Sequence, residues 1–155
     1  LGKARIVADG REVLVPLAPI DPRSLMQGDY MALRFSLADE IGRTLDAARS
    51  ADGESTETDR ADDPRIAAHE GAFGRAPVEL DEHGVAQLDW TATTPELVLR
   101  YRLRDGRVWL GTNAFFFEEG QVERYRDARY GVFRVDPDSG EAVLTGLADA
   151  EFGRL

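Results

Sequence analysis

The alternation of apolar and arginine side chains over residues 97–104 is the strongest constraint on what this chain can fold into. Three leucines and Tyr101 share one side of an extended segment there, and three arginines share the other. Slipping the register by one residue would turn three guanidiniums into the core, so the pattern fixes which face is buried. Asp105-Gly106 follows at once and is the strongest hairpin signal in the chain. The sequence therefore predicts a half-exposed strand that turns back into a second one.

Eight further segments have the composition of strands. Each is rich in β-branched, leucine or aromatic residues and is bounded by glycine, proline or aspartate, which are typical of turns. These segments are residues 12–17, 30–35, 78–80, 85–90, 108–110, 114–117, 130–135 and 142–147. We expect residues 114–117 to form a buried strand, and the last two segments to pair as a hairpin.

One helix is clearly indicated. Apolar residues recur at spacings of four, four and three between Leu37 and Ala48, which predicts a helix of about three turns with one apolar stripe. Ser36 is positioned to cap it, and Ser36 and Asp39 form a weak version of a capping box. Two shorter helical segments are predicted over residues 64–73 and 118–127.

Residues 49–64 contain no large apolar side chain and are predicted to form a long polar surface loop. Together the elements predict a mainly β fold on the borderline of α+β: an antiparallel barrel or sandwich with one packed helix at about 37–48. A chain of 155 residues fits a single domain over residues 1–155, which can bury about 70% of its unfolded surface.

A second informative stretch covers residues 19–35, where turn residues separate two strand-like runs. Proline at 16 and 19 ends the first run, and Asp21-Pro22 favours a turn. Gly28 and Asp29 then precede the second run; glycine permits positive φ, and the aspartate can cap turn amides. The side chain of Asp29 has two interpretations, a turn cap or a catalytic or ligand-binding carboxylate, and turn caps are the commoner case.

This stretch resembles the bacterial GDYXXLXY protein family. The resemblance rests on Gly28-Asp29-Tyr30, then Leu33 and the aromatic Phe35, where the family motif has tyrosine. The ring is kept and the hydroxyl is lost. A second block supports it: Phe115-Phe116-Phe117-Glu118-Glu119-Gly120, Glu123, Tyr125, Ala128-Arg129-Tyr130-Gly131, Phe133-Arg134-Val135-Asp136 and Leu144.

The resemblance implies a domain of unknown function with no established catalytic residues, carried behind one N-terminal membrane-spanning helix. On that basis we expect residues 1–155 to be the part of the protein on the extracytoplasmic side of the bacterial cytoplasmic membrane, with the anchoring helix absent from this chain. The longest apolar runs here, such as residues 13–20, are too short to span a bilayer.

Charge and composition exclude several classes of function. A net charge of −10 argues against nucleic acid, which needs a basic footprint. The absence of cysteine excludes thiol catalysis and cysteine-based zinc sites. His69 and His83 lack metal-ligand spacing, so we expect no metal and no cofactor. Residues 100–134 hold 8 arginines against 5 acids, whereas 39–82 hold 13 acids against 5 arginines. This uneven distribution indicates either two solvated faces or a face for an anionic ligand.

The aromatic run at 115–117 suggests a contact site, because neighbouring residues of a strand face opposite sides. Either both faces are covered or one ring is exposed, and Arg129 and Arg134 are placed to rim such a site. The predicted binding or motif residues are Gly28, Asp29, Tyr30, Leu33, Phe35, Phe116, Glu118, Glu119, Gly120, Arg129 and Tyr130.

Three functions are compatible with this sequence. The first is a non-catalytic module that binds a membrane-protein partner or a small anionic ligand through these residues. The second is a hydrolase-like enzyme that uses Asp29 with Glu118 or Glu119, and it requires two of these carboxylates to converge in a cleft. The third is a structural subunit of a membrane complex, and it requires an exposed apolar patch.

Overall fold

The computed structural model describes residues 2–18, 26–27, 30–50, 63–112, 114–118 and 120–155. All pairings between its named strands are antiparallel, and the strands form three sheets that curl into a half-barrel. The expected mainly β fold with one packed helix is confirmed. None of the described helices is long and apolar enough to cross a membrane.

The largest sheet has four strands in the order β5-β4-β6-β7. Its strands are β4 (Phe73–Leu80), β5 (Ala86–Leu88), β6 (Leu97–Arg104) and β7 (Arg107–Trp109). Strand β6 has the predicted bounds, and its leucines and Tyr101 are buried. The predicted hairpin turn joins β6 to β7, with φ of 53° at Asp105 and 71° at Gly106. Positive φ at both central residues is the geometry that Asp-Gly favours.

Two three-stranded sheets complete the fold. One has the order β1-β9-β10, with β1 (Arg11–Pro16) and β10 (Ala142–Ala148) flanking β9 (Tyr130–Val135). The other has the order β2-β3-β8, built from β2 (Met26–Gln27), β3 (Tyr30–Ala32) and β8 (Ala114–Phe116). The predicted hairpin between the last two strands is confirmed by the β9–β10 pairing.

The tip of the β9–β10 hairpin ties two sheets together. The Arg100 N–H donates to the Gly140 carbonyl at 2.8 Å. Gly140 has a φ of 77°, and a Cβ there would lie 2.8 Å from the Val98 carbonyl oxygen. Both the backbone conformation and the close approach therefore require glycine at position 140.

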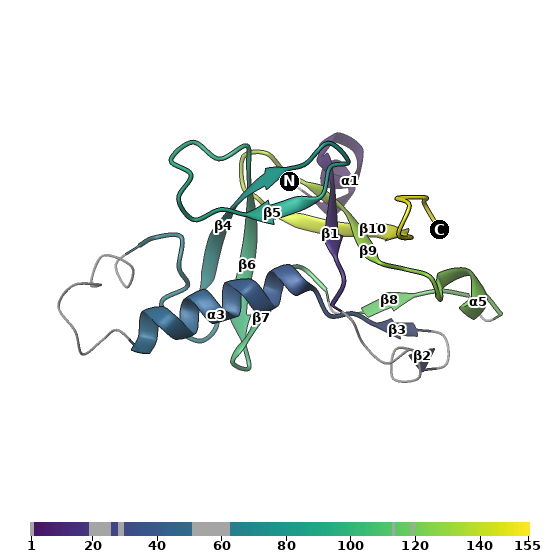
Figure 1. Ribbon diagram of the computed structural model, residues 1–155, viewed down its shortest axis with the longest axis horizontal. Helices are drawn as coiled ribbons and strands as arrows, with labels where there is room; N and C mark the ends of the chain where they lie inside the picture. The colour runs from purple at the N-terminus through teal and green to yellow at the C-terminus, as the bar shows by residue number, and fades with distance from the viewer. Residues whose placement is uncertain (1, 19–25, 28–29, 51–62, 113, 119) are drawn as a thin grey trace.

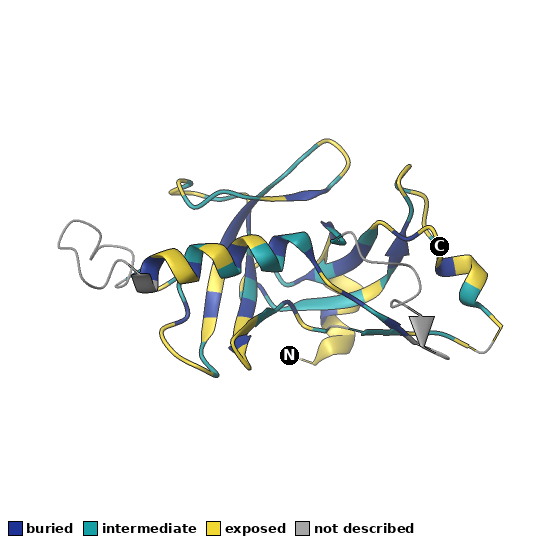
Figure 2. Ribbon diagram, turned by 60° about the horizontal axis from the view of Figure 1, so that its bottom comes forward, coloured by how far each residue is buried: buried dark blue, intermediate teal, exposed yellow. Residues whose placement is uncertain are grey.

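Helix α3 (Ser36–Ser50) packs its predicted stripe against the curled sheets. The four apolar residues of the stripe are at most 5% exposed: Leu37, Ile41, Leu45 and Ala48. Figure 2 shows buried and exposed residues alternating along this helix, as an amphipathic helix requires. The helix begins at Ser36 itself, and the Asp39 carboxylate accepts a bond from Arg34 Nε at 3.1 Å. Two short helices, α1 (Lys3–Asp9) and α5 (Val122–Tyr125), complete the described elements.

Strand β4 begins earlier than predicted and passes through Pro77 although it is a central strand. The Pro77 carbonyl accepts a bond from the Asp89 N–H at 2.9 Å, just beyond the end of β5. Because the N–H and C=O of a strand residue point to the same side, the missing N–H of Pro77 also faces that end. The proline therefore costs no ladder bond to β6.

Two sequence predictions are wrong. Residues 64–73 form turns and the start of β4 instead of a helix. The Tyr101 hydroxyl bonds backbone groups of this segment: it donates to the Arg65 carbonyl at 2.9 Å and accepts from the Ala67 N–H at 3.0 Å. Strand β8 was expected to be buried, but its residues are half-buried or exposed.

Candidate functional site

The two sequence blocks that suggested a binding face lie side by side in the structure. Strand β3 pairs with β8 so that Tyr30 is opposite Phe116 and Met31 is opposite Phe115. Figure 1 shows β2, β3, β8 and α5 at one end of the molecule, beyond β1 and away from the four-stranded sheet. We call these four elements the arm.

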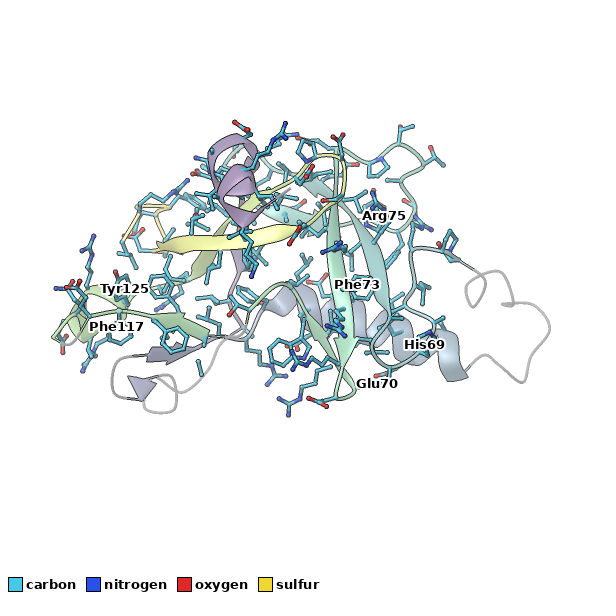
Figure 3. All side chains as sticks on the ribbon, turned by 180° about the vertical axis from the view of Figure 1, so that it is seen from behind. His69, Glu70, Phe73, Arg75, Phe117 and Tyr125 are labelled. Carbon is cyan, nitrogen blue, oxygen red and sulfur yellow. The ribbon has the colours of Figure 1, made fainter. Side chains whose placement is uncertain are left out.

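An aromatic cluster holds the arm together. The ring of Tyr125, on α5, lies 5.0 Å from the ring of Phe115 and 5.4 Å from that of Phe117. Tyr125 is buried, and Figure 3 shows its side chain beside that of Phe117 at this end of the molecule. Phe115 and Phe117 point to this cluster, and strand periodicity sends the residue between them to the other side. Phe116 is accordingly 72% exposed, the largest exposure of any described large apolar residue.

Two of the predicted motif residues belong to the core. Leu33 and Phe35 are 7% and 4% exposed. The Phe35 ring meets the Phe133 ring edge-on at 5.3 Å between centroids, and a Cβ on Gly131 would lie 2.8 Å from Phe35 Cε1. The ring at position 35 therefore has a packing role, and the aromatic character of the motif at this position needs no contact with a ligand.

The remaining predicted residues are spread around the arm. Glu118 is exposed, and Gly120 has a φ of 90°. Arg129 is exposed and donates to the carbonyl of its neighbour Ala128 at 2.9 Å, while Tyr130 is half-buried and lies 5.3 Å from the Phe152 ring. Gly28, Asp29 and Glu119 lie outside the described residues, as does the side chain of Tyr30.

Arg134, the second arginine expected to rim the aromatic site, is engaged elsewhere. It lies near the far end of β9 and pairs with Glu12 at 3.5 Å, and it also donates to the Gly10 carbonyl. Of the carboxylates proposed for a hydrolase, only Glu118 falls within the described residues. Asp29 and Glu119 lie outside them.

A cleft of about 530 Å³ lies between α3 and β7, and sequence reasoning did not predict it. Leu33 and Phe35 form part of its lining, with Arg34, Arg43 and Arg107 at its polar wall. Asp39 and Asp46 also line it, so the charges are mixed. No sequence signal marks this cleft, because it forms between segments about 60 residues or more apart.

Histidines and acidic groups form no metal site in the described part of the chain. The His83 ring stacks on the Phe152 ring at 4.1 Å between centroids, and His69 Nδ1 lies 2.9 Å from the Glu70 carbonyl oxygen. Both histidines, whose spacing did not match that of metal ligands, make local contacts.

Asp63 and Tyr101 have shifted pKa values, and both lie outside the arm in contacts that support the fold. Hydrogen bonds from the Arg65 side chain lower the pKa of Asp63, and one bond from the Arg65 backbone N–H acts in the same direction. Burial raises the pKa of the Tyr101 hydroxyl. The Asp63 carboxylate bonds Arg65 within its own segment, and the Tyr101 hydroxyl bonds that segment from β6, so neither shift indicates an acid-base catalyst.

Comparison with known proteins identifies one family. The sequence pattern described as GDYXXLXY protein matches residues 1–147. Neither the curated proteins nor the solved structures include a match to this chain.

Proposed function

The chain belongs to the GDYXXLXY protein family, and from that premise we propose that it is a non-catalytic interaction module on the extracytoplasmic side of a bacterial membrane. The module would be anchored by an N-terminal helix and would dock a membrane-protein partner through the arm. One observation carries this proposal, namely the 72% exposure of Phe116 on the arm.

The exposed ring belongs to a strand that can accept a partner. Among the described strands, β8 is at the edge of the β2-β3-β8 sheet. An edge strand presents unpaired backbone groups, and a partner strand can add to it. Fully burying a phenylalanine side chain contributes roughly 1.5–3 kcal/mol. A partner that covers Phe116 therefore gains apolar burial in addition to the backbone hydrogen bonds of an added strand.

The arm is also preorganised for binding. Phe115 and Phe117 contact Tyr125 and hold β8 against α5 before any partner arrives. Because β8 is already paired with β3, little conformational entropy remains to be lost when its outer side is covered. These two features favour a rigid docking surface over a flexible recognition loop.

Cysteine labelling of the full-length, anchored protein tests both parts of the proposal. The chain has no cysteine, so Glu118→Cys and Thr93→Cys each place one thiol. Glu118 is exposed just beyond β8, and its replacement leaves the Phe116 ring in place. Thr93 is exposed in the turn before β6, outside the arm, and serves as the matched control. A membrane-impermeant maleimide is added to intact spheroplasts, and labelling rates are compared with those of the purified chain.

We expect the Thr93→Cys thiol to react before lysis. We expect the Glu118→Cys thiol to react much more slowly in spheroplasts than in the purified chain. Reaction of the control thiol only after lysis would contradict the extracytoplasmic location. Equal rates for Glu118→Cys in both settings would contradict docking through the arm.

A further inference from the structure

A second surface, separate from the arm, concentrates positive charge on the four-stranded sheet. The three arginines of β6 lie on the side opposite its buried residues. They line a hollow of about 210 Å³ together with Lys3, Phe73 and Trp109. Figure 3 shows Phe73 on the face of the sheet turned away from α3. We call this hollow the arginine hollow.

Aromatic rings hold the guanidiniums of the arginine hollow in place. The Cζ atoms of Arg100 and Arg102 lie 4.6 and 5.3 Å from the centre of the Phe73 ring. The Cζ of Arg104 lies 5.3 Å from the centre of the Trp109 ring. Each ring face attracts the cation above it and restricts its rotamers. The Arg102 Nε–H also donates to the Gly71 carbonyl at 3.2 Å, which fixes this side chain further.

The charge in the arginine hollow is largely uncompensated. Glu141 is the acidic residue in its lining and lies 3.9 Å from Arg100. Within the described ranges, Lys3, Arg102 and Arg104 form no ion pair with a carboxylate. This is notable in a chain with 29 acidic and 19 basic side chains.

Strand geometry places these cations close enough to repel one another. Alternate residues of a strand are roughly 7 Å apart, which is less than the Debye length of about 8 Å at physiological salt. A bound anion would relieve this repulsion and would accept charge-assisted bonds from several guanidiniums at once.

We propose that the arginine hollow binds a phosphate group. Arginine forks match the oxygens of phosphate, and the small volume suits a phosphate or phosphodiester headgroup better than a larger ligand. The group belongs either to an anionic lipid headgroup at the membrane or to a soluble phosphate ester. This proposal is independent of the arm and of its partner.

Tryptophan fluorescence reports on this site directly. The chain has two tryptophans. The substitution Trp90→Phe leaves Trp109, which lines the arginine hollow, as the only tryptophan. The Trp90 Nε1 is buried without a hydrogen-bond partner in the described structure, so the change removes no bond. The Trp90→Phe chain is titrated with glycerol 1-phosphate and, separately, with phosphatidylglycerol vesicles. Calorimetry measures the same binding without a fluorophore, and glycerol and phosphatidylcholine vesicles are the uncharged controls.

We expect saturable binding of the phosphate ester, of the phosphatidylglycerol vesicles, or of both. Binding of the ester identifies a soluble ligand class, and binding of the vesicles alone identifies a lipid headgroup. The absence of binding to both probes in calorimetry would overturn the proposal.

Charge-matched variants test whether binding is local. In the triple variant Arg100→Gln, Arg102→Gln and Arg104→Gln, affinity should fall at least tenfold, which is about 1.4 kcal/mol. The control variant Arg43→Gln, Arg124→Gln and Arg126→Gln removes the same charge from α3, α5 and the residue that follows α5, and its affinity should stay within about twofold. Circular dichroism checks that both variants fold, and equal losses in the two would overturn the assignment to this hollow.

One substitution should raise the affinity for the phosphate group instead of lowering it. Glu141→Gln removes the acidic side chain that lies 3.9 Å from Arg100. The bond from the Glu141 N–H to Ser139 Oγ is made by the backbone and is kept. We expect affinity to rise severalfold, and a fall would contradict the proposed anion site.

Discussion

Two exposed phenylalanines, one on the four-stranded sheet and one on the arm, are in opposite environments. Phe73 is 52% exposed, and two guanidiniums cover its ring. Phe116 is 72% exposed on an edge strand of a sheet with two- and three-residue strands. The first ring positions charged neighbours and the second presents apolar surface, so exposure alone does not reveal the role of an aromatic residue.

The same contrast extends to the packing behind each ring. Behind Phe73 lies the main core, where Tyr101 and Phe133 are each 1% exposed. Behind Phe116 lie two half-buried phenylalanines on Tyr125, at the edge of the same hydrophobic core. We therefore expect the aromatic residues of the arm to contribute less to global stability than those of the body.

The largest effect should come from the core. Phe133→Ala removes a buried ring that packs edge-on against Phe35, and we expect a loss of about 3–5 kcal/mol in the free energy of unfolding. Phe115→Ala in the arm is the matched change and should cost about 1–2 kcal/mol, because Phe115 is only half-buried. Urea unfolding followed by circular dichroism measures both, and equal losses would break the distinction between body and arm.

The next effect concerns the Tyr101 hydroxyl. Tyr101→Phe leaves the Ala67 N–H and the Arg65 carbonyl without this partner, so we expect a loss of about 1–3 kcal/mol. Hydrogen exchange at the Ala67 amide should speed up by more than the global loss of stability explains. If that amide exchanges no faster, the hydroxyl does not hold the segment.

A smaller effect distinguishes the two exposed rings directly. Phe73→Leu keeps an apolar side chain but removes two cation–π contacts, worth about 0.5–1 kcal/mol each at an exposed site. Phe116→Leu should change the free energy of unfolding by no more than about 0.5 kcal/mol. Thermal unfolding of the two variants compares them, and an equal or larger loss at position 116 would show that this ring is structural.

The smallest effect is a pH dependence at Asp63. The Arg65 hydrogen bond lowers the pKa of this carboxyl from its ordinary value of 3.8. A lowered folded-state pKa adds stability above the unfolded value, and that stability is lost as pH falls through the folded value. Wild type should therefore exceed Asp63→Asn in stability at pH 7, and the difference should shrink below about pH 4. Urea midpoints at pH 7, 4 and 3 measure it, and a constant difference would exclude a role for the carboxylate charge.

Local patterns predicted the regular elements well. The alternation over 97–104 and the Asp-Gly turn gave β6 and its hairpin, and the apolar spacing gave the buried stripe of α3. Predictions failed where another segment supplied the decisive contact. The helix expected over 64–73 is absent because the Tyr101 hydroxyl bonds the backbone of Arg65 and Ala67 from β6. Helix α1 was not predicted, and Ile6 is its buried residue.

The candidate sites were predicted only in part. The arm follows from two blocks that the sequence marked, and its exposed ring was one of the two outcomes that strand periodicity allowed. Phe35 and Leu33 were marked with them and are core residues. Missing from the prediction was the arginine hollow, because the three arginines were recognised as an exposed face while Phe73, their aromatic support, was expected in a helix.

The sequence by itself determined the buried side of β6, the position of the main helix and an antiparallel fold, because residue periodicity and turn residues encode those features locally. Only the tertiary structure decided which segments meet. A glycine at position 74 accommodates Tyr101 because a Cβ there would lie 2.1 Å from the Tyr101 ring. Phe73 supports Arg100 and Arg102 through contacts between residues that are distant in sequence. Such contacts depend on sheet order and register, which no single segment contains.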